Sequence, residues 1–158
     1  MNRRLPRLAI LIAVLGLVPF FVFALAAMRA APGGPARALT ILMAYGAAVL
    51  AFLGGVHWGF ALQEAPAAPE TRRIEHARLL LGVVPALVAW LALLLPLASL
   101  GLAVLIAGYI GAAVLEDQGW RRGVVPSGYI WLRWVLTVVV AALLVTVLVL
   151  RLLGRQIV

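Results

Sequence analysis

The sequence predicts an all-α integral membrane protein, a bundle of five transmembrane helices. Of its 158 residues, 66% are hydrophobic and 11% are charged, and the mean hydropathy is +1.15, which is far outside the range of soluble domains. Apolar runs of about 20 residues, enough to cross ~30 Å of hydrocarbon as a helix, recur along the chain. These runs are continuous and do not alternate between apolar and polar residues, so the pattern favours helices over a membrane β-barrel.

The apolar runs define one transmembrane domain over residues 1–158. The first run follows a short basic head and is longer than the ~7 to 15 apolar residues of a signal peptide, so we expect a retained helix that is kinked at Pro19. The polar stretches 63–78 and 116–127 are expected to be loops outside the membrane. A short connection around Ser99 makes the third and fourth helices an antiparallel hairpin. The five helices are expected at about 8–28, 38–62, 77–95, 99–115 and 128–150.

Arginine placement predicts the orientation in the membrane. With five spans, the head and the second and fourth connections share one side of the membrane. That side collects Arg3, Arg4, Arg7, Arg72, Arg73, Arg78, Arg121 and Arg122, and the other side has Arg29, Arg37, Arg151 and Arg155. Since basic residues favour the cytoplasmic side, we expect a cytoplasmic N-terminus and an outward C-terminus in the cell inner membrane, or the equivalent orientation towards the matrix in an organelle.

The overall charge of +8 does not indicate a nucleic-acid partner, because the arginines are scattered at helix ends. The chain has no cysteine, which excludes disulfides and zinc-thiolate sites. The histidines and carboxylates lack metal-ligand spacing, so we expect neither a metal nor a cofactor.

The second helix is expected to be the central one. Small residues recur on it every fourth position, and such a stripe allows another helix to approach closely. The stripe comprises Ala47, Ala51, Gly55 and Gly59. Packing within the chain is preferred, and a seam between two copies is the alternative. His57 lies ~200° around the helix from Gly55, so both faces should be covered.

Polar residues from three helices are expected to meet near the cytoplasmic end, because His57 and Trp58 end one span, Asp117 follows another, and Tyr129 and Arg133 begin the last. The histidine could be hydrogen-bonded beside an interfacial tryptophan, could titrate near neutral pH, or, least favoured, could bind haem or metal. Arg133 could extend to the interface, or it could pair with Asp117 or Glu116, because charges at membrane depth usually face a partner.

Four stretches of the chain resemble a known family. They are VPF at Val18 to Phe20, YGAAVLAFLGGVHWG at Tyr45 to Gly59, VPALVAWLALLLP at Val84 to Pro96, and PSGYIWLRWVLT at Pro126 to Thr137. They are similar to the domain of unknown function 3429 family, small polytopic membrane proteins that include transmembrane protein sixty-nine of animals. In the last stretch, Gly128 and Val135 depart from the family pattern. The resemblance implies a helical bundle in an inner membrane and carries no established activity.

The function expected from these observations is non-enzymatic binding or assembly. A cytoplasm-facing polar pocket of His57, Trp58, Asp117, Tyr129 and Arg133 would take a lipid-like or anionic ligand, or would dock a partner membrane protein. The alternative is a small oligomeric transporter or proton-coupled carrier. A membrane enzyme is less favoured, because the sequence has no nucleophile elbow, P-loop or dinucleotide fingerprint. The expected partners are membrane lipids, a second copy of the chain, or another membrane protein, and no nucleic acid.

Overall fold

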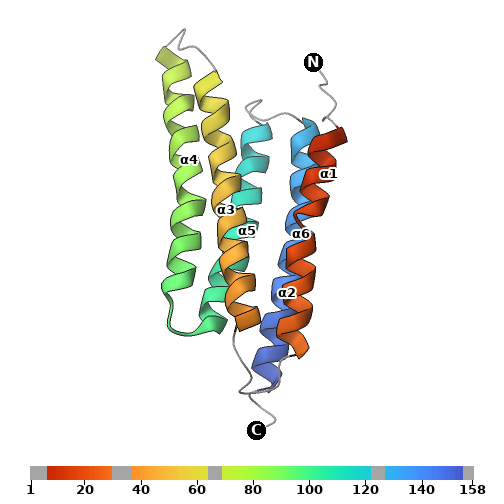
Figure 1. Cartoon of the computed structure of the whole chain (residues 1–158). Coiled ribbons are helices and arrows are strands. Elements are labelled where there is room, and N and C mark those ends of the chain that lie inside the picture. Colours follow the sequence, from red (N-terminus) through yellow and green to blue (C-terminus); the bar gives the residue numbers. More distant parts are fainter. Residues whose placement is uncertain (1–6, 30–36, 64–68, 122–126, 155–158) are drawn as a thin grey trace.

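The computed structural model describes residues 7–29, 37–63, 69–121 and 127–154, and within these ranges all secondary structure is helical. Six helical segments make five passes through the bundle, because the first pass is broken in two (Figure 1). The all-α membrane fold predicted from the sequence is therefore confirmed. The segments are α1 (Arg7–Leu15), α2 (Val18–Arg29), α3 (Arg37–Gln63), α4 (Pro69–Leu94), α5 (Ala98–Arg121) and α6 (Ser127–Gly154).

Four segments of the described chain are long and apolar enough to cross a membrane, namely Arg7–Arg29, Arg37–Gly59, Ala98–Gln118 and Ile130–Gly154. In α4 the apolar segment among the described residues, Gly82–Leu94, is shorter. The surface of the bundle is apolar as well, and Phe52 and Trp131 are among its most exposed large side chains, at 71% and 70%. Such a surface suits lipid.

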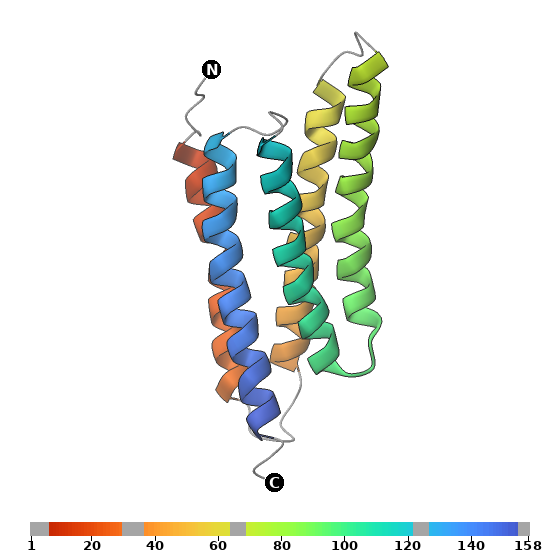
Figure 2. The ribbon, with the colours of Figure 1, turned by 180° about the vertical axis from the view of Figure 1, so that it is seen from behind.

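The passes lie side by side and alternate in direction. Figures 1 and 2 show α3 and α4 together at one edge of the bundle, α5 beside them, and α6 with α1 and α2 at the other edge. Helices α1, α4 and α6 begin at the end where α3 and α5 finish, and we call this the N-terminal end of the bundle. The expectation that this end faces the cytoplasm remains a prediction.

The first pass breaks just before Pro19, where the sequence predicts a kink. Pro19 has no amide hydrogen, so the helical hydrogen bonds around it are interrupted. The Leu17 amide donates to the Val14 carbonyl (3.0 Å), a tighter turn than the α-helix makes. The Tyr45 hydroxyl, from α3, donates to the Gly16 carbonyl (2.9 Å). A backbone group freed within hydrocarbon therefore has a partner, and the broken pass is fixed to α3.

The buried core draws side chains from α2, α3, α4, α5 and α6, and three aromatic rings from α2, α3 and α5 meet within it. The ring of Phe20 packs edge-on against Tyr45 (5.0 Å between centroids) and Tyr109 (6.3 Å). The Tyr109 hydroxyl donates to the Gly46 carbonyl on α3 (2.7 Å). Both tyrosines thus combine ring packing with a hydrogen bond to a neighbouring helix, which satisfies their polar atoms inside the bundle.

The small-residue stripe of α3 packs inside the bundle only in part. Ala47 is buried and Ala51 is half-buried, but Gly55 and Gly59 are exposed, and a methyl group on either would meet nothing within 4 Å. The prediction that these two glycines pack within the chain is therefore wrong. Residues four apart drift ~40° around a helix at each step, whereas Gly54, seven residues after Ala47, is only ~20° away from it. Gly54 makes the close contact, against Gly82 of α4.

Two helices extend further than the apolar runs indicate. Helix α4 begins at Pro69, so much of the stretch 63–78, expected to be a loop, is helical. Helix α5 continues to Arg121, so Glu116 and Asp117 are helical and not part of a loop. Charged residues such as Glu and Arg are good helix formers, so a helix can continue past the membrane boundary where the apolar run stops. Proline at a helix start costs no hydrogen bond, which suits Pro69.

Candidate functional site

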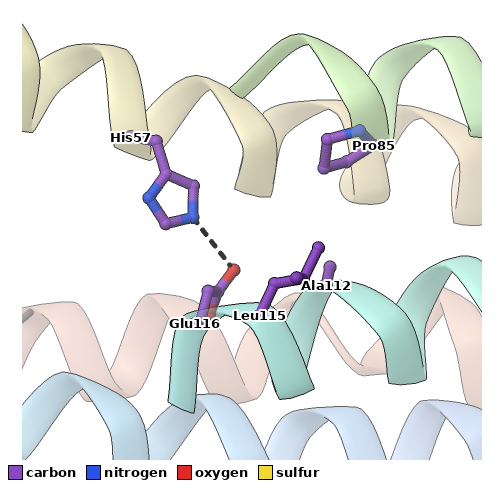
Figure 3. Close-up of a pocket in the computed structure, with 5 residues that line it drawn as sticks. All are labelled: His57, Pro85, Ala112, Leu115 and Glu116. Carbon is purple, nitrogen blue, oxygen red and sulfur yellow. Dashed lines mark hydrogen bonds and ion pairs between the residues drawn. The ribbon is translucent and has the colours of Figure 1, made fainter. Parts of the chain in front are cut away.

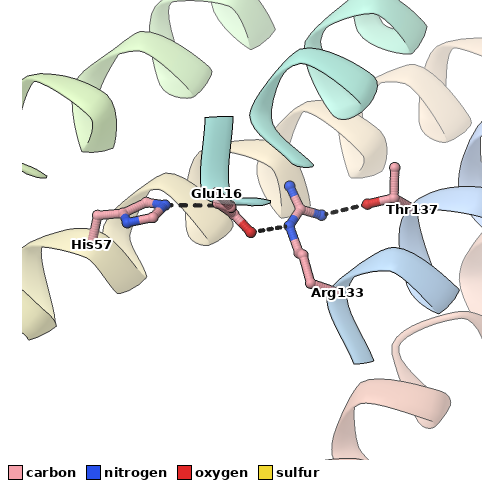
Figure 4. Close-up of polar contacts among 4 residues, drawn as sticks. All are labelled: His57, Glu116, Arg133 and Thr137. Atoms are coloured by element: carbon pink, nitrogen blue, oxygen red, sulfur yellow. Dashed lines mark hydrogen bonds and ion pairs between the residues drawn. The ribbon is translucent and has the colours of Figure 1, made fainter. Parts of the chain in front are cut away.

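A buried polar cluster joins three helices at the N-terminal end of the bundle (Figure 4). It consists of His57 on α3, Glu116 on α5, and Arg133 and Thr137 on α6, with exposures of 6%, 3%, 2% and 2%. One carboxylate oxygen of Glu116 accepts from Arg133 Nε (2.8 Å), and the other lies 3.3 Å from His57 Nε2. Arg133 Nη1 donates to the Thr137 hydroxyl (3.0 Å). We call these four residues the Glu116 cluster.

Helix geometry explains why these residues meet. Helices α3 and α5 both run towards the N-terminal end and α6 runs away from it, so the last turns of two helices face the first turns of the third. Arg133 and Thr137 are four residues apart and therefore share one face of α6. Trp58 and Trp131 neighbour the cluster in sequence and are 45% and 70% exposed. Tryptophans are enriched at the membrane interface, so we expect the cluster to lie close beneath that level.

The pair of Glu116 and Arg133 is a desolvated ion pair. Bringing two charges out of water is costly, and the cost is offset only when hydrogen bonds of good geometry satisfy them. Glu116 is well satisfied, because each oxygen has a nitrogen partner. Arg133 is not, because its Nη2 is buried and has no hydrogen-bond acceptor among the described residues. With His57 neutral, the charges of the cluster sum to zero.

The structure brings two of the five predicted pocket residues, His57 and Arg133, together. They meet through Glu116, which is not one of the five. His57 and Arg133 contact opposite oxygens of Glu116, which settles the choice between Asp117 and Glu116 as the buried partner of Arg133. Asp117 is half-buried and lies ~100° around α5 from Glu116.

Of the two aromatic residues of the predicted pocket, Trp58 lies outside the cluster, and the position of Tyr129 is not described. The Trp58 ring is partly exposed and its Nε1 donates to the Leu79 carbonyl of α4 (3.1 Å), so it joins two helices outside the cluster. Tyr129 belongs to α6, but its side chain lies outside the described residues. The predicted pocket does not include Glu116, the central residue of the cluster in the structure. Tyr109, Ala112 and Glu116 share one face of a helix that continues past residue 115, and this pattern could have identified Glu116.

A small cavity lies beside the cluster, between α3, α4 and α5 (Figure 3). His57 and Glu116 supply its polar wall, and Pro85, Ala112 and Leu115 supply its apolar wall. Its volume of about 10 Å³ is close to the minimum that one water molecule needs. Arg133 does not line it. The cavity can therefore take one polar atom, with apolar surface beside it.

No gathering of three His, Cys, Asp or Glu side chains suited to a metal ion occurs in the part of the chain that the structure describes. The polar groups available for chemistry are an imidazole and a carboxylate 3.3 Å apart. Such a pair can hold a hydrogen-bonding group or exchange a proton.

Comparison with known proteins agrees with this architecture. Residues 5–149 match the family described as "Protein of unknown function (DUF3429)". The chain is 38% identical over 135 residues to Transmembrane protein 69 of Xenopus tropicalis, covering 85% of this chain and 51% of that protein. It is 40% identical over 90 residues to Transmembrane protein 69 of Mus musculus, covering 56% of this chain and 34% of that protein.

The matched parts thus span about half and one third of the lengths of these two relatives. No solved structure shows significant similarity to the chain. The family match extends over nearly all of the sequence, from before α1 into the last turns of α6. The chain therefore belongs to the DUF3429 family of membrane proteins.

Proposed function

We propose that this membrane protein is a non-enzymatic binding protein that holds the polar end of a lipid-soluble molecule between His57 and Glu116. The observation that carries the proposal is the cavity, because it combines two hydrogen-bonding side chains with apolar walls at membrane depth. Ionisable residues within membrane spans are costly and usually serve a function. The ligand would enter at the N-terminal end of the bundle, which we expect from the arginine distribution to face the cytoplasm across an inner membrane.

The cavity favours a neutral ligand over an anionic one. Glu116 forms part of its wall, and a second negative charge at about 4 Å would be repelled by roughly 4 kcal/mol at an effective dielectric constant of ~20. Arg133 lies behind Glu116 and does not line the cavity, so it is further from the ligand than Glu116 is and offsets this repulsion only in part. Of the two ligand types expected from the sequence, lipid-like and anionic, the geometry supports the lipid-like one.

Size and chemistry define the ligand further. About 10 Å³ admits one hydroxyl or carbonyl oxygen but not a phosphate or a sugar. A hydroxyl can donate to the Glu116 carboxylate and accept from the imidazole of His57, which can act as donor or acceptor. Pro85, Ala112 and Leu115 would contact the adjoining hydrocarbon. A long-chain alcohol or a quinol fits this description.

A proton-coupled carrier is the second candidate, and the contact between His57 and Glu116 favours it, because both groups can exchange protons. A carrier also needs a polar path across the membrane. Below the cluster, the described core is built mainly from apolar residues such as Leu42, Leu50 and Leu105. Only Tyr45 and Tyr109 interrupt it, and each donates to a backbone carbonyl. This core supports binding better than transport.

Photolabelling in lipid nanodiscs tests the proposal. The probe is hexadecanol carrying a diazirine close to its hydroxyl, and palmitic acid with the same diazirine serves as the anionic comparison. We expect the alcohol to label peptides around Pro85 and Leu115 more strongly than the acid does. Ala112→Leu should reduce this labelling because it fills the cavity, whereas Gly111→Leu should not, since Gly111 is exposed and a methyl group there meets nothing. Equal labelling of both variants in folded protein would refute a ligand in this cavity.

A further inference from the structure

Three arginines lie at the end of the bundle opposite the Glu116 cluster, which we call the C-terminal end. Helix α2 ends at Arg29, α3 begins at Arg37, and Arg151 lies in the last turn of α6. All three side chains are exposed. Three of the apolar spans begin or end at or just beside these residues. We therefore expect the three guanidinium groups at the depth of the lipid headgroups.

The same three helix ends pack against one another. Met28 and Ala38, each next to one of these arginines, pack against the buried core cluster. Val147, one turn before Arg151, is buried within that cluster. Helix α2 contacts both α3 and α6 (Figure 1). Packed helices lie ~8 to 10 Å apart, so charges on neighbouring ends are about one Debye length apart and are only partly screened.

The chain supplies no acidic residue to neutralise this end. Its five acidic residues are Glu64, Glu70, Glu75, Glu116 and Asp117. They lie in the connection from α3 to α4, in the first turns of α4 and in the last turns of α5, all of which adjoin the N-terminal end. The connections from α2 to α3 and from α4 to α5, and the residues after α6, contain only neutral and basic residues. The positive charge of the C-terminal end is therefore uncompensated within the chain.

Helix dipoles explain two of these arginines but not the third. Arg29 and Arg151 lie in the last turns of their helices, where the negative end of the dipole favours a cation. Arg37 lies at the start of α3, the positive end, and the first turn of α3 has no acidic residue. No residue from Pro35 to Leu39 has a side-chain oxygen to cap the first amides of that helix. An anion beside Arg37 would therefore interact favourably with the arginine and with the start of the helix.

An apolar face leads from Arg29 and Arg37 towards the middle of the membrane. On α2, Leu25 and Val22 lie one and two turns before Arg29 on the same side of the helix, and both are exposed. On α3, exposed Ala44 lies two turns after Arg37. Figure 1 shows α2 and α3 in front of α6 and α5, and Figure 2 shows the reverse. The exposed faces of α2 and α3 therefore belong to one side of the bundle.

We propose that this side of the bundle binds an anionic phospholipid from the leaflet at the C-terminal end. Arg29, Arg37 and Arg151 bind the phosphate of its headgroup, and an acyl chain lies along the exposed faces of α2 and α3. Guanidinium groups suit this role, because each can donate two parallel hydrogen bonds to a phosphate. The apolar face favours a lipid over free phosphate, which would use the arginines alone. The site is separate from the cavity at the N-terminal end, and neither proposal depends on the other.

Native mass spectrometry in an uncharged detergent counts bound lipids and tests the site. The probe is dioleoyl phosphatidylglycerol, and the comparison is dioleoyl phosphatidylcholine, which has the same acyl chains and no net charge. Each basic residue near a membrane surface strengthens the binding of anionic lipid by roughly fivefold. We therefore expect the wild type to bind the anionic lipid about tenfold or more tightly than the neutral one. The triple variant Arg29→Gln, Arg37→Gln, Arg151→Gln should lose this preference.

The control removes the same charge from the other end of the chain, through Arg3→Gln, Arg4→Gln and Arg7→Gln in the basic head. This variant should keep the preference for phosphatidylglycerol. Lysine at the three positions of the C-terminal end preserves the charge and should also keep most of the preference. Circular dichroism checks that each variant is folded. A preference that survives the glutamine substitutions at the C-terminal end, or that both glutamine triples lose equally, would overturn the site.

Two further measurements test whether the ligand is a lipid. Excess inorganic phosphate should leave phosphatidylglycerol bound, and its displacement by phosphate would assign the arginines to the free anion and overturn the lipid. Ala44→Trp should weaken phosphatidylglycerol binding by filling the path of the acyl chain. Ala103→Trp should not, because Ala103 is an exposed residue of α5, which lies on the other side of the bundle (Figure 2). Equal effects of the two tryptophans would overturn the acyl-chain contact.

Discussion

Replacing Glu116 by glutamine should destabilise the bundle more than replacing Arg133 by methionine. Arg133 is 2% exposed and cannot lose its proton, so Glu116→Gln leaves a buried charge without a counter-ion. Breaking a buried pair in this way costs about 3–5 kcal/mol. Arg133→Met leaves Glu116 with the imidazole of His57 as a remaining hydrogen-bond partner. We therefore expect a smaller loss, about 1–3 kcal/mol.

The double variant, Glu116→Gln with Arg133→Met, should be more stable than the sum of the single losses indicates, because it removes the charge that the first substitution leaves unpaired. The assay is equilibrium unfolding of the detergent-purified protein by increasing fractions of sodium dodecyl sulfate, followed by circular dichroism. Gln118→Ala is the control, since Gln118 is an exposed residue of the same helix and should change stability by less than about 0.5 kcal/mol.

Equal stability loss in the two single variants, or a loss below about 1 kcal/mol for Glu116→Gln, would contradict a desolvated ion pair. Either would mean that Arg133 reaches water or lipid headgroups when its partner is removed, and that the pair is not desolvated in the membrane.

Three further predictions concern packing and orientation. Gly54→Ala should lower the free energy of unfolding by about 1–3 kcal/mol in the same assay, because the added methyl group meets the backbone of α4. Gly55→Ala should leave it unchanged, and equal effects of the two substitutions would contradict the contact between Gly54 and Gly82. Tyr45→Phe should lower the free energy of unfolding by about 1 kcal/mol, because the Gly16 carbonyl loses the Tyr45 hydroxyl as its hydrogen-bond donor. No loss of stability would mean that this carbonyl has another donor at the helix break. In a bacterial host, alkaline phosphatase fused after the last residue should be active and a fusion after α3 inactive; the reverse pattern would overturn the orientation.

The fold followed from the sequence because long apolar runs leave the backbone few alternatives in a membrane. The ends of the helices could not be predicted from the sequence, because hydropathy marks where the hydrocarbon stops and not where the hydrogen-bonded helix stops. Helix α4 therefore begins at Pro69, before its apolar run, and α5 continues through Glu116 to Arg121. The small-residue stripe predicts a contact at Gly55 and not at Gly54 for a similar reason, since a four-residue repeat only approximates a helix of 3.6 residues per turn.

The site could be predicted in outline. His57 and Arg133 stand out because each lies within an apolar run, and the structure joins them through one carboxylate. That Glu116 and not its neighbour Asp117 fills the role depends on the rotation of α5, which a pair of adjacent carboxylates in the sequence does not reveal. The cavity could not be predicted, because its small volume depends on how Pro85 and Leu115 pack from different helices.

The candidate site depends on the buried ion pair of Glu116 and Arg133. Solid-state NMR on protein in lipid bilayers tests it most directly, by measuring the dipolar coupling between the guanidinium ¹⁵Nε of Arg133 and the carboxyl ¹³C of Glu116. With Nε 2.8 Å from the carboxylate oxygen, we expect a clear coupling that is absent in Glu116→Ala. A guanidinium signal that shows no coupling to this carboxyl carbon would contradict the ion pair.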